Sequence, residues 1–337
     1  MGKSHALVLG TKGCRWALGP SGGCFMCGYS ADVPASPPSP DELLEAFRRD
    51  WAGRVKAVRE EGTPVAIKIY TSGSFLDPQE VPPRVADEIL SLVLSEADAW
   101  EVVVETRAEH VNEEVISRLA SLVADAGFNP QPGHPRLELG VGLESADDRV
   151  REACVNKGLD WGTFEAAART CRKVGLGVKC YLLFKPPFLD EAKAIDDLAS
   201  SVVKAAELGV TTVSVNPTSV HRATVVEWLY SRGAYRPGWV LSLLAALLEA
   251  TRQLAGRGVP LPRVLCAPTG PGKPRGVHDC LDLPESSASS LAALGEFVRT
   301  QDPAALERAL SKDGDCHRRW ADFVAVSRYL ARDLDIE

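Results

Sequence analysis

Apolar segments alternate with amphipathic segments through the first two-thirds of the chain. Runs rich in Val, Ile, Leu and aromatic residues predict six strands, at residues 6–10, 65–73, 101–107, 136–145, 178–186 and 211–219. Between them, apolar residues recur at helical spacing in residues 39–62, 83–96, 113–126, 161–174 and 191–207. Ser39 followed by Pro40 is typical of a helix start. Apolar strands joined by helices in this way predict a parallel sheet buried on both faces.

The number of strand–helix units is too small for a closed eight-stranded barrel. The pattern therefore predicts an α/β fold, a partial (β/α)6 barrel of the TIM type. After about residue 224 the alternation ends, and a strong helix, a segment rich in Pro and Gly and further helical sequence follow. We expect residues 1–223 to form the barrel core and residues 224–337 to form a mostly helical C-terminal extension that completes the substrate side.

Composition narrows the class of protein. The chain has 337 residues, is 45% hydrophobic and carries a formal net charge of −7. It contains no apolar run of about eighteen residues and no signal-peptide pattern, so we expect a cytoplasmic protein without a membrane span. Cysteines in a reducing compartment are buried thiols or metal ligands more often than disulfides. The acidic charge argues against a dedicated nucleic-acid binder.

Three of the nine cysteines lie close together in a segment rich in glycine. Cys14 is followed by nine residues, then Cys24, two residues and Cys27. Structural zinc normally has four protein ligands, and no fourth ligand lies nearby. Three thiolates with one open position suit a [4Fe–4S] cluster, and three unrelated free cysteines remain the alternative.

From these cysteines to about residue 218 the sequence resembles the radical S-adenosylmethionine (SAM) superfamily. The wide first gap is similar to that of the Elongator catalytic-subunit branch. The resemblance implies a radical SAM barrel, a [4Fe–4S] cluster and SAM as cofactors. SAM would chelate the fourth iron and, after reduction by an electron donor, yield a 5′-deoxyadenosyl radical.

Polar residues follow successive predicted strands, where ligands bind in parallel α/β sheets. The sequence YTSGSFLD resembles the family's SAM amino-group motif in part, because Ser72, Gly73 and Ser74 stand where the family has a double glycine and an acid. Arg107 suits the methionine carboxylate, and Met26 stands where the family has an aromatic residue near the adenine. Loop packing is the alternative for Met26, and helix capping is the alternative for the strand-end residues. The candidate cofactor-binding residues are Met26, Ser72, Gly73, Ser74, Glu105, Arg107, Glu144 and Ser145.

Longer strings, including YLLFKPPFLDEAKAI and APTGPGKPRGVHDC, resemble the archaeosine-forming radical SAM enzymes of archaea over residues 11–320. The resemblance implies a tRNA substrate whose D-loop carries a 7-deazaguanine with lysine attached through an amidine nitrogen. The enzyme would act as a C–N lyase that leaves archaeosine and releases the lysine remnant as an aldehyde or cyclic imine. It also implies a partner, the archaeosine synthase that attaches the lysine.

The amino and carboxylate groups of that lysine need charged or polar partners. We expect Lys179, Lys185, Asn216 and His221, on or after the fifth and sixth strands, to face the substrate pocket. Lys157 could either cap a helix or approach the cofactor.

Basic residues in the last third of the chain are candidates for contact with RNA: Lys273, Arg275, Arg318 and Arg319. Solvated loop charges are the alternative. Cys266, His278, Cys280 and Cys316 could bind a second metal, zinc, with buried thiols and a loop histidine as the alternative.

Two other functions stay open at this stage. The chain could be another radical SAM enzyme of the same branch that modifies tRNA or a small molecule. It could also be a non-catalytic iron–sulfur protein, although such a protein needs no polar residues at its strand ends.

Overall fold

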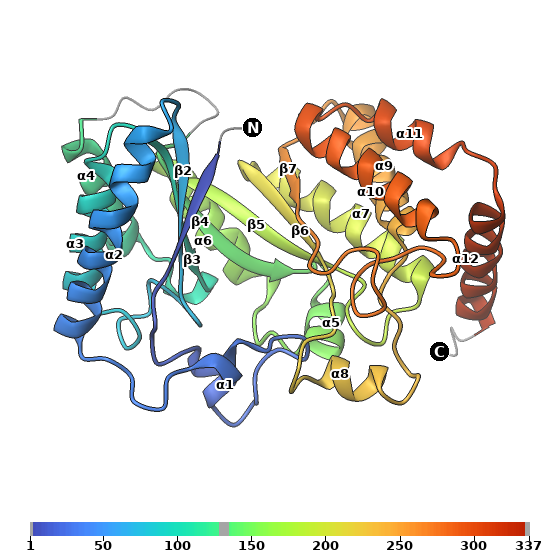
Figure 1. The fold of residues 1–337 in the computed structure, drawn as a ribbon, viewed down its shortest axis with the longest axis horizontal. Coiled ribbons are helices and arrows are strands. Elements are labelled where there is room, and N and C mark those ends of the chain that lie inside the picture. The colour runs from blue at the N-terminus through green and yellow to red at the C-terminus, as the bar shows by residue number, and fades with distance from the viewer. Residues whose placement is uncertain (1–2, 128–134, 334–337) are drawn as a thin grey trace.

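A single sheet of parallel strands forms the centre of the protein (Figure 1). The computed structural model describes residues 3–127 and 135–333. The strands pair in chain order: β1 (Ser4–Val8), β2 (Val65–Tyr70), β3 (Ala99–Thr106), β4 (Leu137–Glu144), β5 (Gly177–Phe184), β6 (Thr212–Pro217) and β7 (Arg263–Cys266). Within the described residues β1 and β7 are the unpaired edges, so the barrel is open. The predicted fold class, a partial α/β barrel, is confirmed.

Helices cover the outside of the barrel. They include α2 (Pro40–Glu60), α3 (Pro83–Leu94), α4 (Glu113–Asp125), α6 (Trp161–Lys173), α7 (Glu191–Leu208) and α9 (Val240–Arg257). Ser39 caps α2, because its side chain accepts from the Glu42 amide while the Glu42 carboxylate accepts from Ser39 N. None of the helices described is long and apolar enough to cross a membrane.

Short helices gather at the end of the barrel where the strands terminate (Figure 1). They are α1 (Arg15–Leu18), α5 (Asp148–Val150), which runs into a π-helical turn at Arg151–Val155, and α8 (Val225–Tyr230). Two 3₁₀ turns, Tyr29–Asp32 and Ala108–His110, complete the connections. This end therefore carries the loops that can form a site.

The two faces of the sheet differ in chemistry. Ile67, Ile69, Val102 and Val104 belong to the main apolar core between sheet and helices. The alternate positions point the other way and line the barrel, and they include Lys68 between the two isoleucines. The barrel interior is thus polar.

The C-terminal third contributes to the sheet as well as to the helical layer. β7 pairs parallel to β6 and extends the sheet by one strand beyond the six that the sequence pattern predicted. Its Arg263 reaches across the barrel to Glu101 on β3, at 2.7 Å, and to Glu138 on β4, at 3.2 Å. Three helices follow β7: α10 (Pro284–Thr300), α11 (Ala304–Leu310) and α12 (Asp315–Asp333).

Candidate functional site

The loop after β1 carries the three cysteines under the carboxyl ends of the strands. Cys14 is the N-cap residue of α1, Cys24 is half-buried, and Cys27, also half-buried, lies three residues farther on. Burial raises the pKa of Cys27, and the neighbouring Cys14 thiol raises it further. In the described part of the chain no three His, Cys, Asp or Glu side chains converge closely enough to hold a bare metal ion. Three thiols that influence one another on a single loop are nevertheless a donor set that fits an iron–sulfur cluster.

A second segment, Asn156–Gly158, is hydrogen-bonded to the cysteine loop at the barrel mouth, the end of the barrel where the strands terminate. The Asn156 side chain donates to the backbone oxygens of Ser21, at 3.0 Å, and Gly23, at 2.8 Å. The Trp16 indole in turn donates to Asn156 O at 2.7 Å. The Trp16 ring packs against Gly158, where an added Cβ would lie 2.3 Å from a ring carbon. The sequence alone does not indicate Asn156 and Gly158, because nothing local to them shows which distant loop they contact.

Lys157, between them, points its side chain toward the cysteines. Its Nζ lies 2.8 Å from Glu144 Oε1, and both residues are buried. Burial raises the pKa of Cys24 to about 11, while the positive charge of Lys157 acts in the opposite direction. The approach of Lys157 to a bound cofactor stays a prediction. Gly142 makes room, since a Cβ there would lie 2.5 Å from the ammonium nitrogen.

Glu144 itself sits in a bend at the end of β4. Its φ is 70°, in the left-handed region that non-glycine residues rarely adopt. The pairing register between β4 and β5 shifts at the same point. This bend turns the carboxylate toward Lys157 and away from the strand, an arrangement common at functional sites.

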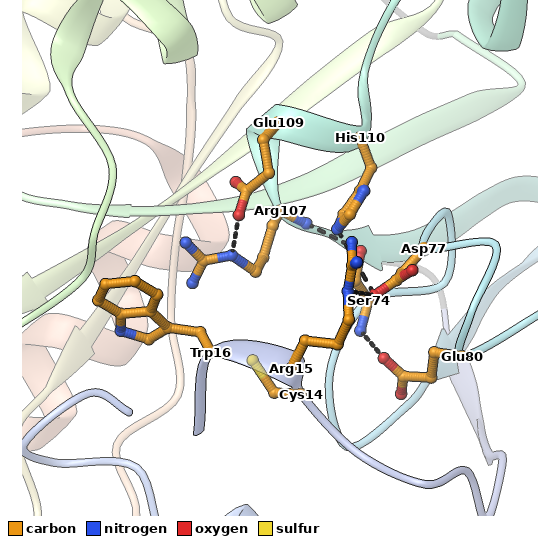
Figure 2. A pocket seen from close by; sticks show the side chains of 9 residues that line it. All are labelled: Cys14, Arg15, Trp16, Ser74, Asp77, Glu80, Arg107, Glu109 and His110. Carbon is orange, nitrogen blue, oxygen red and sulfur yellow. Dashed lines mark hydrogen bonds and ion pairs between the residues drawn. The ribbon is translucent and has the colours of Figure 1, made fainter. Parts of the chain in front are cut away.

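Arg107 lies at one wall of a cavity of about 210 Å³ beside Cys14 (Figure 2). Its Nε contacts the Glu109 carboxylate and its Nη2 donates to Lys157 O at 3.0 Å. The guanidinium lies 5.6 Å from the centroid of the Trp16 ring. Among the described residues Nη1 has no hydrogen-bond partner, so it is available to an anionic ligand. The cavity is lined by Cys14, Arg15, Trp16, Ser74, Asp77, Glu80, Arg107, Glu109 and His110.

The turn after β2 packs directly against Cys14. An added Cβ on Gly73 would lie 2.6 Å from Cys14 N, so only glycine fits between the two loops. Glu80 holds this turn, because its carboxylate accepts from Ser74 N at 2.5 Å and from the Thr11 hydroxyl. Burial raises the pKa of Glu80. The sequence motif indicated Ser72, Gly73 and Ser74 but gave no signal for Glu80, which lies six residues farther along.

Three of the predicted site residues are engaged by the protein's own packing. The Ser145 hydroxyl donates to Asp197 of α7 at 2.6 Å and is fully buried. Met26 packs against the apolar cluster around α8. Lys185 donates to Arg236 O at 2.7 Å and lies 3.1 Å from the Glu191 carboxylate.

His221 and Asn216 lie near the mouth of the barrel. A Cβ on Gly28, next to Cys27, would come within 3.3 Å of the His221 side chain. His221 also contacts the Ser219 hydroxyl at 2.8 Å. Asn216 is half-buried near the end of β6 and makes no side-chain hydrogen bond within the described residues.

Glu105 and Lys179 point into the barrel interior. The Glu105 carboxylate interacts with the Tyr181 hydroxyl, and burial raises its pKa. The Lys179 ammonium lies 5.4 Å from the centroid of the Tyr181 ring.

The residues proposed for a second metal do not converge in the described parts of the chain. The Cys280 amide donates to Cys316 Sγ at 3.2 Å, within a small apolar cluster that includes Trp239. The His278 ring is instead bonded to Gly276 O at 2.8 Å. Cys266 ends β7.

The basic residues proposed to contact RNA fall in two places. Arg275 pairs with Glu227 of α8 at 2.7 Å, and the exposed Lys273 lies on the same loop. Arg318 and Arg319, on α12, pair with Asp313, at 3.0 Å, and Asp282, at 2.7 Å.

Comparison with known proteins identifies the family. The chain is 35% identical over 329 residues to archaeosine synthase subunit beta of Methanosarcina acetivorans, spanning 97% of this chain and 86% of the relative. It is 34% identical over 320 residues to archaeosine synthase subunit beta of Thermococcus kodakarensis, spanning 95% and 91%. The chain belongs to the archaeosine synthase subunit beta family. The family resemblance that the sequence motifs suggested is thereby confirmed.

The fold has a match among solved structures. Streptococcus suis SuiB aligns with a TM-score of 0.50 and 12% identity, covering 80% of this chain and 50% of that chain. No protein-family model matches the chain. At this identity the structural likeness supports the fold, and family membership rests on the two sequence relatives.

Proposed function

We propose that this chain is a radical SAM enzyme that converts the lysine adduct of a 7-deazaguanine in the tRNA D-loop into archaeosine. When bound together, a [4Fe–4S] cluster and SAM supply a 5′-deoxyadenosyl radical that removes a hydrogen atom from a carbon. Membership of the archaeosine synthase subunit beta family supports this proposal most directly. The three cysteines on one loop at the strand ends support it independently.

The residues on and around the cysteine loop have distinct proposed roles. Cys14, Cys24 and Cys27 would ligate the cluster. The Lys157 ammonium lies near Cys24 and would offset part of the negative charge of the thiolates. We assign Arg107 to the SAM carboxylate, because Arg107 lines the cavity beside Cys14 and its Nη1 has no hydrogen-bond partner among the described residues.

The polar turn after β2 would position the amino group of SAM. Ser74 is held by Glu80 and by the Thr106 hydroxyl, at 2.8 Å, so its position is fixed before a ligand arrives. Pre-ordered groups lower the entropy cost of binding. Glu144 would face the same ligand from β4, held by Lys157.

Family membership supports the proposed substrate and partner. The relatives are named as beta subunits, which supports a partner subunit that attaches the lysine and shares the tRNA. That partner would compensate for the acidic charge of this chain, which weakens its own attraction to RNA. His221 and Asn216 would approach the adduct from the β6 side of the mouth.

The test is product formation by the reduced, iron-loaded protein. We expect anaerobic protein with SAM, dithionite and lysine-adduct tRNA to form archaeosine, read by nucleoside mass spectrometry, with release of 5′-deoxyadenosine. A variant with all three loop cysteines changed to alanine should lose iron and product together. A matched variant, Cys171→Ala, removes a core thiol on α6 and should keep both. Iron-loaded wild-type protein that forms no archaeosine would refute the proposal.

A further inference from the structure

Two lysines inside the barrel have no ion-pair partner. Lys68 on β2 and Lys179 on β5 point into the interior, and neither makes a hydrogen bond or salt bridge in the described part of the chain. Lys179 is only 2% exposed. Burial lowers its pKa, and the nearby charge of Lys68 lowers it further. Two neighbouring ammonium groups that repel each other in a partly buried space form a site for an anion.

The acidic groups nearby divide into two sets. Glu101 and Glu138 are already satisfied, because Arg263 reaches Glu101 with two nitrogens at 2.8 and 2.7 Å and Glu138 at 3.2 Å. The other oxygen of Glu138 accepts from the Thr211 and Thr212 hydroxyls at 2.5 and 2.7 Å. These groups close the end of the barrel at which the strands begin. They leave Lys68 and Lys179 without an ion-pair partner among the described residues.

Glu105 is the remaining carboxylate, and it has no cationic partner within salt-bridge distance among the described residues. It faces Lys179 across Gly140, since the three residues lie in one hydrogen-bonded row over β3, β4 and β5. An added Cβ on Gly140 would lie 2.9 Å from the Tyr181 ring and 3.5 Å from Glu105 Cγ. Glycine at this position therefore lets the Tyr181 ring pack over β4, between Glu105 and Lys179.

We propose that this interior cluster, Lys68, Glu105, Lys179 and Tyr181, binds the α-amino acid end of the substrate's lysine arm. The α-carboxylate lies between the two ammonium groups, and the α-ammonium lies against Glu105. The proposal rests on the proposed function for the identity of the arm, and it assigns Glu105 to the substrate in place of SAM.

A zwitterion suits this cluster better than a simple anion. A phosphate or an isolated carboxylate would satisfy the lysines but would be repelled by Glu105. A ligand that carries both charges satisfies the two ammonium groups and the Glu105 carboxylate. The Tyr181 hydroxyl can donate either to the ligand carboxylate or to Glu105. Four carbon–carbon bonds separate the lysine carbon beside the amidine from its α-carbon, a reach of ~5 Å. The arm can therefore enter the barrel while the base remains at the mouth.

Equilibrium binding without reductant, where no turnover occurs, tests the inference separately from the reaction. Three synthetic nucleosides are compared: the lysine adduct, the diaminopentane adduct without the carboxylate, and the 6-aminohexanoate adduct without the α-amine. We expect loss of either group to weaken binding to the SAM-loaded wild-type protein by about 10- to 100-fold.

Each variant removes the protein side chain that is proposed to bind one of the groups missing from the ligands. Lys179→Met should weaken binding of the lysine adduct by about 10-fold or more and leave the diaminopentane adduct unchanged. Glu105→Gln should weaken binding of the lysine adduct to a similar extent and leave binding of the 6-aminohexanoate adduct unchanged. Lys193→Met, at an exposed position on α7, is the matched control and should change nothing.

Equal weakening of all three nucleosides by Lys179→Met would overturn the inference, because it would indicate a purely structural lysine. Equal binding of the three nucleosides by wild-type protein would overturn it as well. Failure of the proposed function has a different signature, namely selective binding of the lysine adduct with no archaeosine after reduction.

Discussion

At the residue scale, Gly158 shows how a position without a side chain can fix the loop that carries the three cysteines. Its φ is +57° and the Trp16 ring lies over it, so two independent constraints exclude a side chain. Trp16 is in turn bonded to Asn156 and lies two residues after Cys14. A displaced indole would therefore shift Cys14, the first of the proposed cluster ligands.

We expect Gly158→Ala to destabilise the protein and to reduce its iron content. The left-handed backbone costs about 1 kcal/mol for alanine, and the steric overlap with Trp16 should bring the total to roughly 3 kcal/mol. Gly62→Ala is the matched control, because Gly62 has φ +64° but open space around it. Thermal melts and iron assays on both variants measure the difference. Equal losses in the two variants would show that the Trp16 contact does not matter.

Another residue-scale feature links the end of β4 to the helical layer. Burial raises the pKa of Asp197 on α7 to about 6, although the hydrogen bond from Ser145 opposes the shift. A carboxyl whose pKa is raised on folding contributes stability that is complete below its unfolded pKa and is lost as the pH rises through the folded value. The window here runs from about pH 4 to about pH 6.

Asp197→Asn should remove this dependence while keeping an oxygen that accepts from Ser145. We expect the variant to gain stability relative to wild type as the pH rises from 4 to 6.5, by about 2 to 3 kcal/mol in all. Denaturant unfolding of both proteins across that range measures the gain. A stability difference that does not change with pH would contradict the assigned pKa.

At the scale of elements, the sequence predicted what is local and missed what depends on distant pairing. The strands and helices of the first two-thirds follow from apolar periodicity and from caps such as Ser39, which act within a few residues. β7 has only four residues, follows a proline-containing turn and is defined by its pairing with β6. Its Arg263, opposite Glu101 and Glu138, could be recognised only once the sheet was known.

The same distinction holds for the site. The cysteine spacing and the strand-end Arg107 and Glu144 are visible in the sequence because each lies within a compact motif. Asn156 binds backbone far away in the chain, and Glu80 joins Ser74 N to the Thr11 hydroxyl, which is 69 residues away, so no motif contains them. Ser145 was predicted from its place after a strand, yet its side chain turns to the helical layer because the chain bends at Glu144.

At the scale of the whole molecule, the cysteine loop, the segment Asn156–Gly158 and the cavity beside Cys14 all lie at one end of an open barrel (Figures 1 and 2). The polar interior continues from this mouth toward the Arg263 cluster. Cofactor groups at the mouth and substrate groups inside the barrel would bring the reacting carbon between them, shielded from water. A reactive radical requires such shielding.

The central claim is that the protein removes a hydrogen atom from the lysine arm and thereby cleaves its bond to the base. The most direct measurement uses tRNA whose adduct carries deuterium on the lysine carbon beside the amidine nitrogen. We predict that deuterium enters 5′-deoxyadenosine in step with the appearance of archaeosine, as read by mass spectrometry of both products. Archaeosine formed alongside 5′-deoxyadenosine that contains no deuterium would contradict the account.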